Sequence, residues 1–136
     1  MYGQSGMSYV LEHFPIFQSR TDLVDAPAEA VQFFRRLDEP VTIKLFMGTW
    51  CVDSQLHAPV LFKALREADN DLITLQIIAM DRRKQDLDGM VERYDIALSP
   101  TFVVEHEGIE LGRVVETPLV DAATDIADIL RNNLGG

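Results

Sequence analysis

The sequence is poor in cysteine, in basic side chains and in long apolar runs, and each shortage excludes a class of protein. Because Cys51 is its single cysteine, the chain cannot form an internal disulfide, which fits a reducing compartment. No apolar stretch approaches the length that crosses a bilayer. The first residues also lack the charged segment and apolar core of a signal peptide. We therefore expect a cytoplasmic protein with no membrane partner.

Basic side chains are outnumbered by acidic ones, 12 Lys and Arg against 22 Asp and Glu, and the formal net charge of this acidic protein is −10. Such a surface repels phosphate backbones, so we expect no nucleic acid partner. The one dense basic cluster is Arg82-Arg83-Lys84. Because no aromatic residues interleave with it, we interpret this cluster as the solvated start of a helix.

Metal-binding and phosphate-binding motifs are missing as well. His106 lies between Glu105 and Glu107, but neighbouring strand residues point to opposite faces and no second cluster supplies further ligands. His57 follows Cys51 by six residues, nearly opposite on an ideal helix, which argues against a catalytic Cys/His pair. We expect no metal and no resident cofactor.

What the sequence does have is a 47% share of hydrophobic residues over 136 positions, enough to bury a core within one domain. We expect that domain to span residues 25–136. Residues 1–24 form an N-terminal extension, predicted as a short helix or as an edge strand around the Phe14-Pro15-Ile16-Phe17 run, where Pro15 confines a strand to an edge. Met7 is an alternative native start, which would make residues 1–6 a cloning remnant.

Hydrophobic periodicity predicts alternating helices and strands, then a hairpin and a last helix. Asp25 is the candidate cap of the first helix and Pro27 suits its first turn, and the helix should end near Asp38-Glu39-Pro40. The other predicted elements are a strand at 41–47, a helix at 55–68, a strand at 72–80, a polar helix at 83–94, strands at 101–105 and 109–115, and a helix from Pro118 to Gly135. This order predicts an α/β fold in which a mixed sheet of four to five strands is flanked by helices on both faces.

The only cysteine and the only tryptophan are adjacent, in the segment Gly48-Thr49-Trp50-Cys51-Val52-Asp53-Ser54. That segment joins the predicted strand at 41–47 to the predicted helix at 55–68. Unpaired N–H groups and the dipole at a helix start favour negative charge, so a thiolate forms there more easily than in free cysteine. The segment therefore predicts a thiol site.

The order and spacing of several residues resemble the thioredoxin family over most of the chain after about residue 25. These residues are Trp50-Cys51 after a buried strand, Pro59 eight positions after Cys51, Ser99-Pro100-Thr101 before the first hairpin strand, and Gly108 in the hairpin turn. The resemblance implies a thioredoxin fold in which Pro100 is cis and Pro59 is structural. It also implies a substrate groove formed by Trp50, Asp53, Ser99, Pro100 and Thr101, with the Ser99 backbone free to pair with an extended peptide.

Three positions depart from the family pattern. Ser54 replaces the second cysteine, and a hydroxyl cannot attack a mixed disulfide, so a full dithiol reductase cycle within one chain is blocked. Leu45 replaces the family's buried aspartate, and the glycine that borders the family's groove falls near Glu116. The resemblance to monothiol glutaredoxins is limited to the Cys-x-x-Ser motif, in which a serine follows the cysteine by three positions.

The remaining chemistry is that of one thiol. Helix-start amides and the Ser54 hydroxyl would stabilise the Cys51 thiolate, whereas the Asp53 carboxylate would oppose it. The first hypothesis is a monothiol protein of cell redox homeostasis, monomeric or a weak dimer, that forms mixed disulfides with glutathione as co-substrate or with client protein thiols. The alternatives are a non-catalytic binding or adaptor module and a redox sensor that uses a Cys51 sulfenic acid or an intermolecular disulfide.

Overall fold

The computed structural model describes residues 4–86 and 88–135, and in these ranges the chain forms six helices around one four-stranded sheet. The helices are α1 (Gln4–His13), α2 (Pro15–Leu23), α3 (Ala28–Arg36), α4 (Val52–Ala68), α5 (Met90–Arg93) and α6 (Ala122–Leu134). The strands are β1 (Val41–Met47), β2 (Ile73–Ala79), β3 (Thr101–His106) and β4 (Ile109–Val115). Within these ranges, no helix is long and apolar enough to cross a membrane.

The sheet is mixed and its strands follow the order β2-β1-β3-β4. β1 pairs in parallel with β2, from Val41 opposite Ile73 to Met47 opposite Ala79. β3 is antiparallel to β1 and to β4, and the tight turn between β3 and β4 places Gly108 at φ +77°. The predicted mixed sheet and its hairpin are confirmed.

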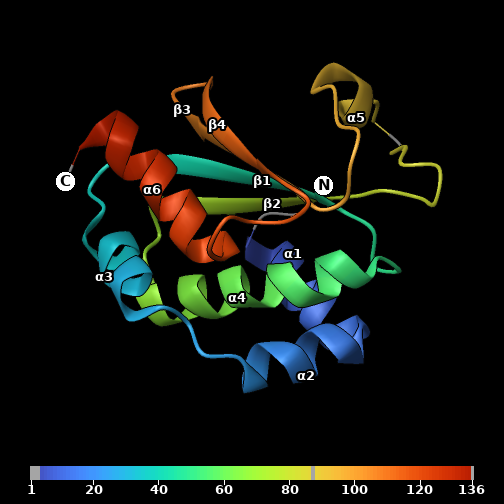
Figure 1. Cartoon of the computed structure of the whole chain (residues 1–136), viewed down its shortest axis with the longest axis horizontal. Coiled ribbons are helices and arrows are strands. Elements are labelled where there is room, and N and C mark those ends of the chain that lie inside the picture. Colours follow the sequence, from blue (N-terminus) through green and yellow to red (C-terminus); the bar gives the residue numbers. More distant parts are fainter. Residues whose placement is uncertain (1–3, 87, 136) are drawn as a thin grey trace.

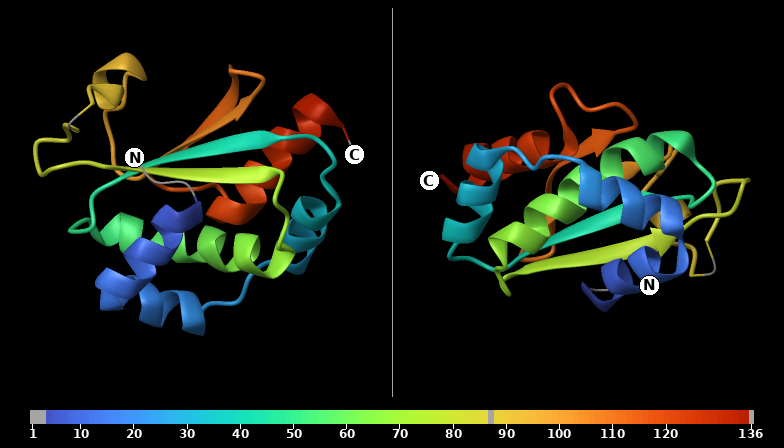
Figure 2. Two further views of the ribbon diagram at one scale, coloured as in Figure 1. Left: turned by 180° about the vertical axis from the view of Figure 1, so that it is seen from behind. Right: turned by 90° about the horizontal axis from the view of Figure 1, so that it is seen from below.

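The two faces of the sheet are covered unequally, as Figures 1 and 2 show: α1 to α4 and α6 lie on one side and the short α5 on the other. The thick side holds the main core, in which Leu45 and Phe102 from the sheet join Phe62 from α4 and Ile126 from α6. The thin side holds a smaller cluster of Phe46, Ile78, Met80, Met90, Val91, Ile96 and Val103. Alternate residues of β1, such as Leu45 and Phe46, thus pack in different clusters, because strand side chains alternate between faces.

The N-terminal segment corrects one sequence expectation. The Phe14-Pro15-Ile16-Phe17 run is not an edge strand: α2 begins at Pro15, and Phe17 is fully buried with its ring 6.4 Å from that of Phe62. Proline suits a first helical turn because no partner is needed there for the missing N–H. The segment that the sequence suggested as an extension therefore packs into the main core through α2 and α4.

The predicted helix at 83–94 is also wrong over most of its length, since only Met90–Arg93 is helical. The reason is local competition for backbone N–H groups. The Asp81 carboxylate accepts the N–H groups of Arg83 and Gln85, and the Asp86 carboxylate accepts that of Val91. Aspartate side chains that bond nearby backbone in this way favour turns over helix.

Two helix starts differ from the sequence prediction as well. α3 begins at Ala28 after Pro27, and Asp25 does not cap it. α6 begins at Ala122, where the Asp121 carboxylate accepts the N–H of Thr124 at 2.8 Å, so the cap is Asp121 and the helix does not start at Pro118. Gly135 ends α6 as predicted.

The burial of α2 yields a stability prediction. Phe17→Ala removes a fully buried ring and should lower the free energy of unfolding by about 3–5 kcal/mol, as measured by urea denaturation. The matched control is Leu23→Ala in the same helix, where the side chain is 79% exposed and the change should be small. Equal midpoints for the Phe17→Ala variant and the unchanged protein would show that α2 is not part of the folded core.

Candidate functional site

Cys51 lies at the junction between β1 and α4, as the N-cap residue of α4 with extended backbone angles. Its N–H donates to the Gly48 carbonyl at 3.1 Å, and its carbonyl accepts the first intrahelical bond, from Gln55 N–H at 3.1 Å. The Gln55 side-chain amide also donates to the Thr49 carbonyl at 3.0 Å. The side chain is buried, with 8% of the residue exposed. The loop is thus closed on the helix start, and the thiol lies where the orphan amides of α4 begin.

The loop before β3 lies against this helix start. The Ser99–Pro100 peptide bond is cis, as the resemblance implies. The Cys51 thiol donates to the Ser99 carbonyl with a separation of 3.4 Å between Sγ and O. The Pro100 carbonyl accepts the Glu116 N–H at 2.7 Å, and the Thr101 hydroxyl donates to the Leu98 carbonyl at 2.7 Å. Ser99 and Cys51 therefore meet in space although 48 positions separate them.

Behind the thiol, two buried serine hydroxyls form a hydrogen-bonded pair. Ser54 Oγ and Ser99 Oγ are 3.1 Å apart, and the Gly48 N–H donates to Ser99 Oγ at 3.2 Å. Ser54 is fully buried in the first turn of α4. The Ser54 hydroxyl is consequently a buried link between α4 and the loop before β3.

These contacts set the pKa of the Cys51 thiol. Burial raises it, because a thiolate loses solvation. The Ser99 hydroxyl lowers the same pKa, as do the N–H and hydroxyl of Ser54 and the N–H of Asp53, since all of them can donate to a thiolate. The donors outweigh the burial, and the net pKa lies below that of an ordinary cysteine. The thiolate that the sequence could only suggest is favoured by these groups together.

Two features fix the position of the Trp50 side chain. Its Nε1–H donates to the Met80 carbonyl at 3.2 Å. A Cβ atom at Gly48 would lie 2.3 Å from Cε2 of the indole, so only glycine leaves room for the ring in this position. The residue that precedes the thiol is therefore fixed by the strand end of β2 on one side and by Gly48 on the other.

The other predicted site residues have more modest places. Asp53 is half-buried in the first turn of α4, and Pro59 is buried within that helix. Leu45 is fully buried in the main core, so no carboxylate lies at its position to assist a proton transfer. Glu116 has φ 58°, in the left-handed region that favours glycine.

Sequence reasoning missed one residue of the site and misjudged another. Arg82 was interpreted as part of a solvated helix start, but its guanidinium lies over the Trp50 ring, 5.5 Å from the centroid. The signal was present in the sequence, because residues 82–84 form the only dense basic cluster. Ser99 was expected to act through its backbone, whereas its hydroxyl also bonds Ser54 and Gly48.

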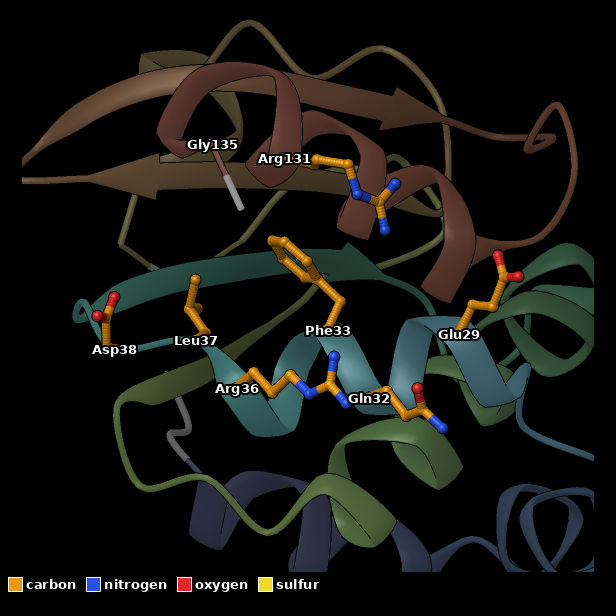
Figure 3. A pocket seen from close by; sticks show the side chains of 8 residues that line it. All are labelled: Glu29, Gln32, Phe33, Arg36, Leu37, Asp38, Arg131 and Gly135. Atoms are coloured by element: carbon orange, nitrogen blue, oxygen red, sulfur yellow. The ribbon is translucent and has the colours of Figure 1, made fainter.

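His106 and the pocket between α3 and α6 lie outside this site. His106 Nε2 is 3.3 Å from a carboxylate oxygen of Glu39, and no group of three or more metal-ligating side chains occurs in the part of the chain that the structure describes. Figure 3 shows a pocket of about 250 Å³ between α3 and the end of α6. Its Arg131 donates to Asp128 and lies over Phe33, so this cation is already engaged.

The fit of Trp50 against Gly48 can be tested by Gly48→Ala. The added methyl group must displace the indole, which should shift the emission of this sole tryptophan to longer wavelength and destabilise the fold by about 1–3 kcal/mol. Fluorescence spectra and urea denaturation measure both effects. Thr49→Ala, a change at the neighbouring position, serves as the control. Unchanged emission in the Gly48→Ala protein would contradict the described position of the ring.

The depressed pKa of Cys51 predicts that alkylation by iodoacetamide reaches half its maximal rate at a lower pH than alkylation of a free cysteine does. Ser99→Ala removes a donor and should move that midpoint upward, whereas Ser19→Ala on the exposed face of α2 should not. Because the folded pKa is the lower one, ionised Cys51 stabilises the fold above the unfolded pKa, and this contribution is lost as pH falls through the folded pKa. A midpoint above that of free cysteine would contradict the prediction.

Comparison with known proteins identifies the architecture. No family model matches the sequence, and no curated protein matches it. Among solved structures, a protein of unknown function from Pseudomonas aeruginosa matches with a TM-score of 0.74 and 19% identity, covering 92% of this chain and 90% of its own.

Named thioredoxins match as well. Thioredoxin-2 of the malaria parasite matches with a TM-score of 0.55 and 13% identity over 72% of this chain and 87% of its own. Thioredoxin O2 from Arabidopsis thaliana matches with a TM-score of 0.54 and 13% identity over 81% of this chain and 90% of its own. Together with the mixed four-stranded sheet flanked by helices, these matches show that the chain has a thioredoxin-like fold.

Proposed function

We propose that the protein is a monothiol thioredoxin-like protein in which Cys51 forms mixed disulfides with glutathione or with client protein thiols. One observation carries the proposal. The Cys51 sulfur is surrounded by donors that lower its pKa, while the position that would hold a resolving thiol holds the buried Ser54 hydroxyl. The chain thus has a thiol that can start thiol–disulfide exchange and no second cysteine thiol that could complete it.

The chemistry follows from one sulfur. The Cys51 thiolate attacks a disulfide R–S–S–R, the Cys51–S–S–R bond forms, and R–S⁻ leaves and takes up a proton from water. Ser54 cannot repeat the attack, because a serine hydroxyl is not ionised near neutral pH. The Ser54 hydroxyl is also hydrogen-bonded to that of Ser99. A second, external thiol must attack the mixed disulfide to release Cys51. Capture is intrinsic to the chain, and turnover depends on another molecule.

A binding or adaptor module is the alternative, and a specific observation favours it. Cys51 is only 8% exposed and, as a neutral thiol, donates to the Ser99 carbonyl, whereas the next residue, Val52, is 63% exposed. A recessed sulfur beside an exposed apolar side chain suits contact with a partner without disulfide exchange. The two functions differ in whether Cys51 is modified.

Incubation with oxidised glutathione followed by intact-protein mass spectrometry distinguishes them. We expect one glutathione per chain in the unchanged protein and none in Cys51→Ser. Ser54→Cys should restore a resolving sulfur three positions after the nucleophile, so that variant should expel the captured glutathione and end as an internal disulfide.

The competing outcome is equally clear. An unmodified Cys51, under conditions that modify a cysteine-containing peptide, would sink the monothiol proposal and leave the binding module. Persistence of the glutathione adduct in Ser54→Cys would show instead that position 54 cannot reach the mixed disulfide in the folded chain.

A further inference from the structure

A cation lies beside the thiol site. The Arg82 guanidinium is 5.5 Å from the centroid of the Trp50 ring, and Trp50 precedes Cys51. Two contacts hold this arrangement in place: the Trp50 indole N–H donates to the Met80 carbonyl, and the Met80 N–H donates to the Met47 carbonyl at 2.9 Å. The segment that follows β2 is therefore tied to the loop that ends in the thiol, and it brings Arg82 with it.

The cations of residues 82–84, which we call the basic turn, are not neutralised by ion pairs within residues 4–86 and 88–135. The nearby carboxylates are occupied by backbone groups instead. Asp81 accepts the N–H groups of Arg83 and Gln85, and Asp86 accepts those that start α5. The side chains of the basic turn therefore remain available to an anion from outside the chain.

Arg82 is suited to such a contact. Its guanidinium lies within cation–π range of the Trp50 ring, an attraction that uses none of its N–H groups as hydrogen-bond donors. No described residue accepts a hydrogen bond from the Arg82 side chain. The fork of N–H groups matches the two oxygens of a carboxylate, so a carboxylate-bearing molecule can dock on Arg82 while its sulfur approaches Cys51.

The basic turn is informative because the rest of the chain is strongly acidic. At a formal charge of −10 most of the surface repels anions, and Asp53 in the first turn of α4 adds to that repulsion at the thiol. Exposed charges attract one another over about 8–10 Å at physiological salt. The basic turn therefore attracts an anion only when that anion binds close to Trp50. It therefore selects among disulfides at this site and does not attract anions to the protein in general.

We propose that the disulfide accepted by Cys51 is a small anionic one, in which a carboxylate binds Arg82 beside Trp50 while the Cys51 thiolate attacks the sulfur. This inference rests on the proposed monothiol function and names its substrate class. The low exposure of Cys51 supports a slender molecule over a broad protein surface. In the step, the Cys51–sulfur bond forms, the substrate disulfide breaks, and the carboxylate-bearing thiolate that leaves takes up a proton from water.

The test compares three disulfides that differ in charge: oxidised glutathione, which is anionic, bis(2-hydroxyethyl) disulfide, which is neutral, and cystamine, which is cationic. Second-order rate constants for modification of Cys51 are measured at one pH. Arg82→Gln should lower the ratio of the glutathione rate to the neutral rate by about threefold, as for the loss of one exposed charge pair. The ratio of the cystamine rate to the neutral rate should rise.

Arg36→Gln is the matched control, because it changes the net charge equally at an exposed position of α3. Arg82→Lys keeps the charge but removes the fork of N–H groups, so it should keep only part of the anion preference, and raised salt should weaken that preference in the unchanged protein. Tryptophan emission of each variant reports whether the indole has moved.

Each outcome bears on one claim. If Arg82→Gln and Arg36→Gln show the same charge ratios as the unchanged protein, the anionic substrate class is wrong while the monothiol function stands. If Arg82→Lys keeps the whole anion preference with its emission unchanged, the fork of N–H groups is wrong as the basis of that preference, and positive charge alone accounts for it. If none of the three disulfides modifies Cys51, the monothiol function fails and this inference fails with it.

Discussion

The thiol site depends on the contact between the loop before β3 and the start of α4, and Ser99 provides most of it. Its carbonyl accepts from the Cys51 thiol, and its hydroxyl bonds both Ser54 and the Gly48 N–H. These groups come from two parts of the chain that are distant in sequence, residues 48–54 and Ser99. Because each polar group is buried and bonded, the loop and the helix cannot separate without leaving unsatisfied donors or acceptors. The same contact that holds the structure also surrounds the sulfur with donors.

Ser54 gives this contact a chemical consequence. Position 54 supplies a hydroxyl that completes a buried polar pair three residues after the thiol. Leu45 is fully buried in the main core and offers no carboxylate there. The site thus surrounds its thiol with groups that favour a thiolate, and the chain holds no second thiol.

The elements that could be predicted correctly from the sequence are those whose pattern of residues allows only one local structure. The strand predicted at 41–47 matches β1 because branched and aromatic residues that are buried on both faces leave few alternatives. The helix predicted at 83–94 failed because apolar spacing was weighed without the turn-forming side chains of Asp81 and Asp86. The sequence left both a short helix and an edge strand open for the N-terminal segment, because a proline after an aromatic residue suits either, and α2 shows that the helix is right at Pro15.

The sequence by itself determined the chemical inventory: one thiol, one tryptophan beside it, no second cysteine, and a strand that leads into a helix at that point. Only the tertiary structure decided how that thiol is tuned and what lies next to it. The pKa of Cys51 depends on Ser99, and the Trp50 ring is accompanied by Arg82, residues that lie 48 and 31 positions further along the chain than Cys51. Periodicity describes which face a residue occupies within its own element, but hydrogen bonds and charges act across space, and only the packed chain brings these groups within their range.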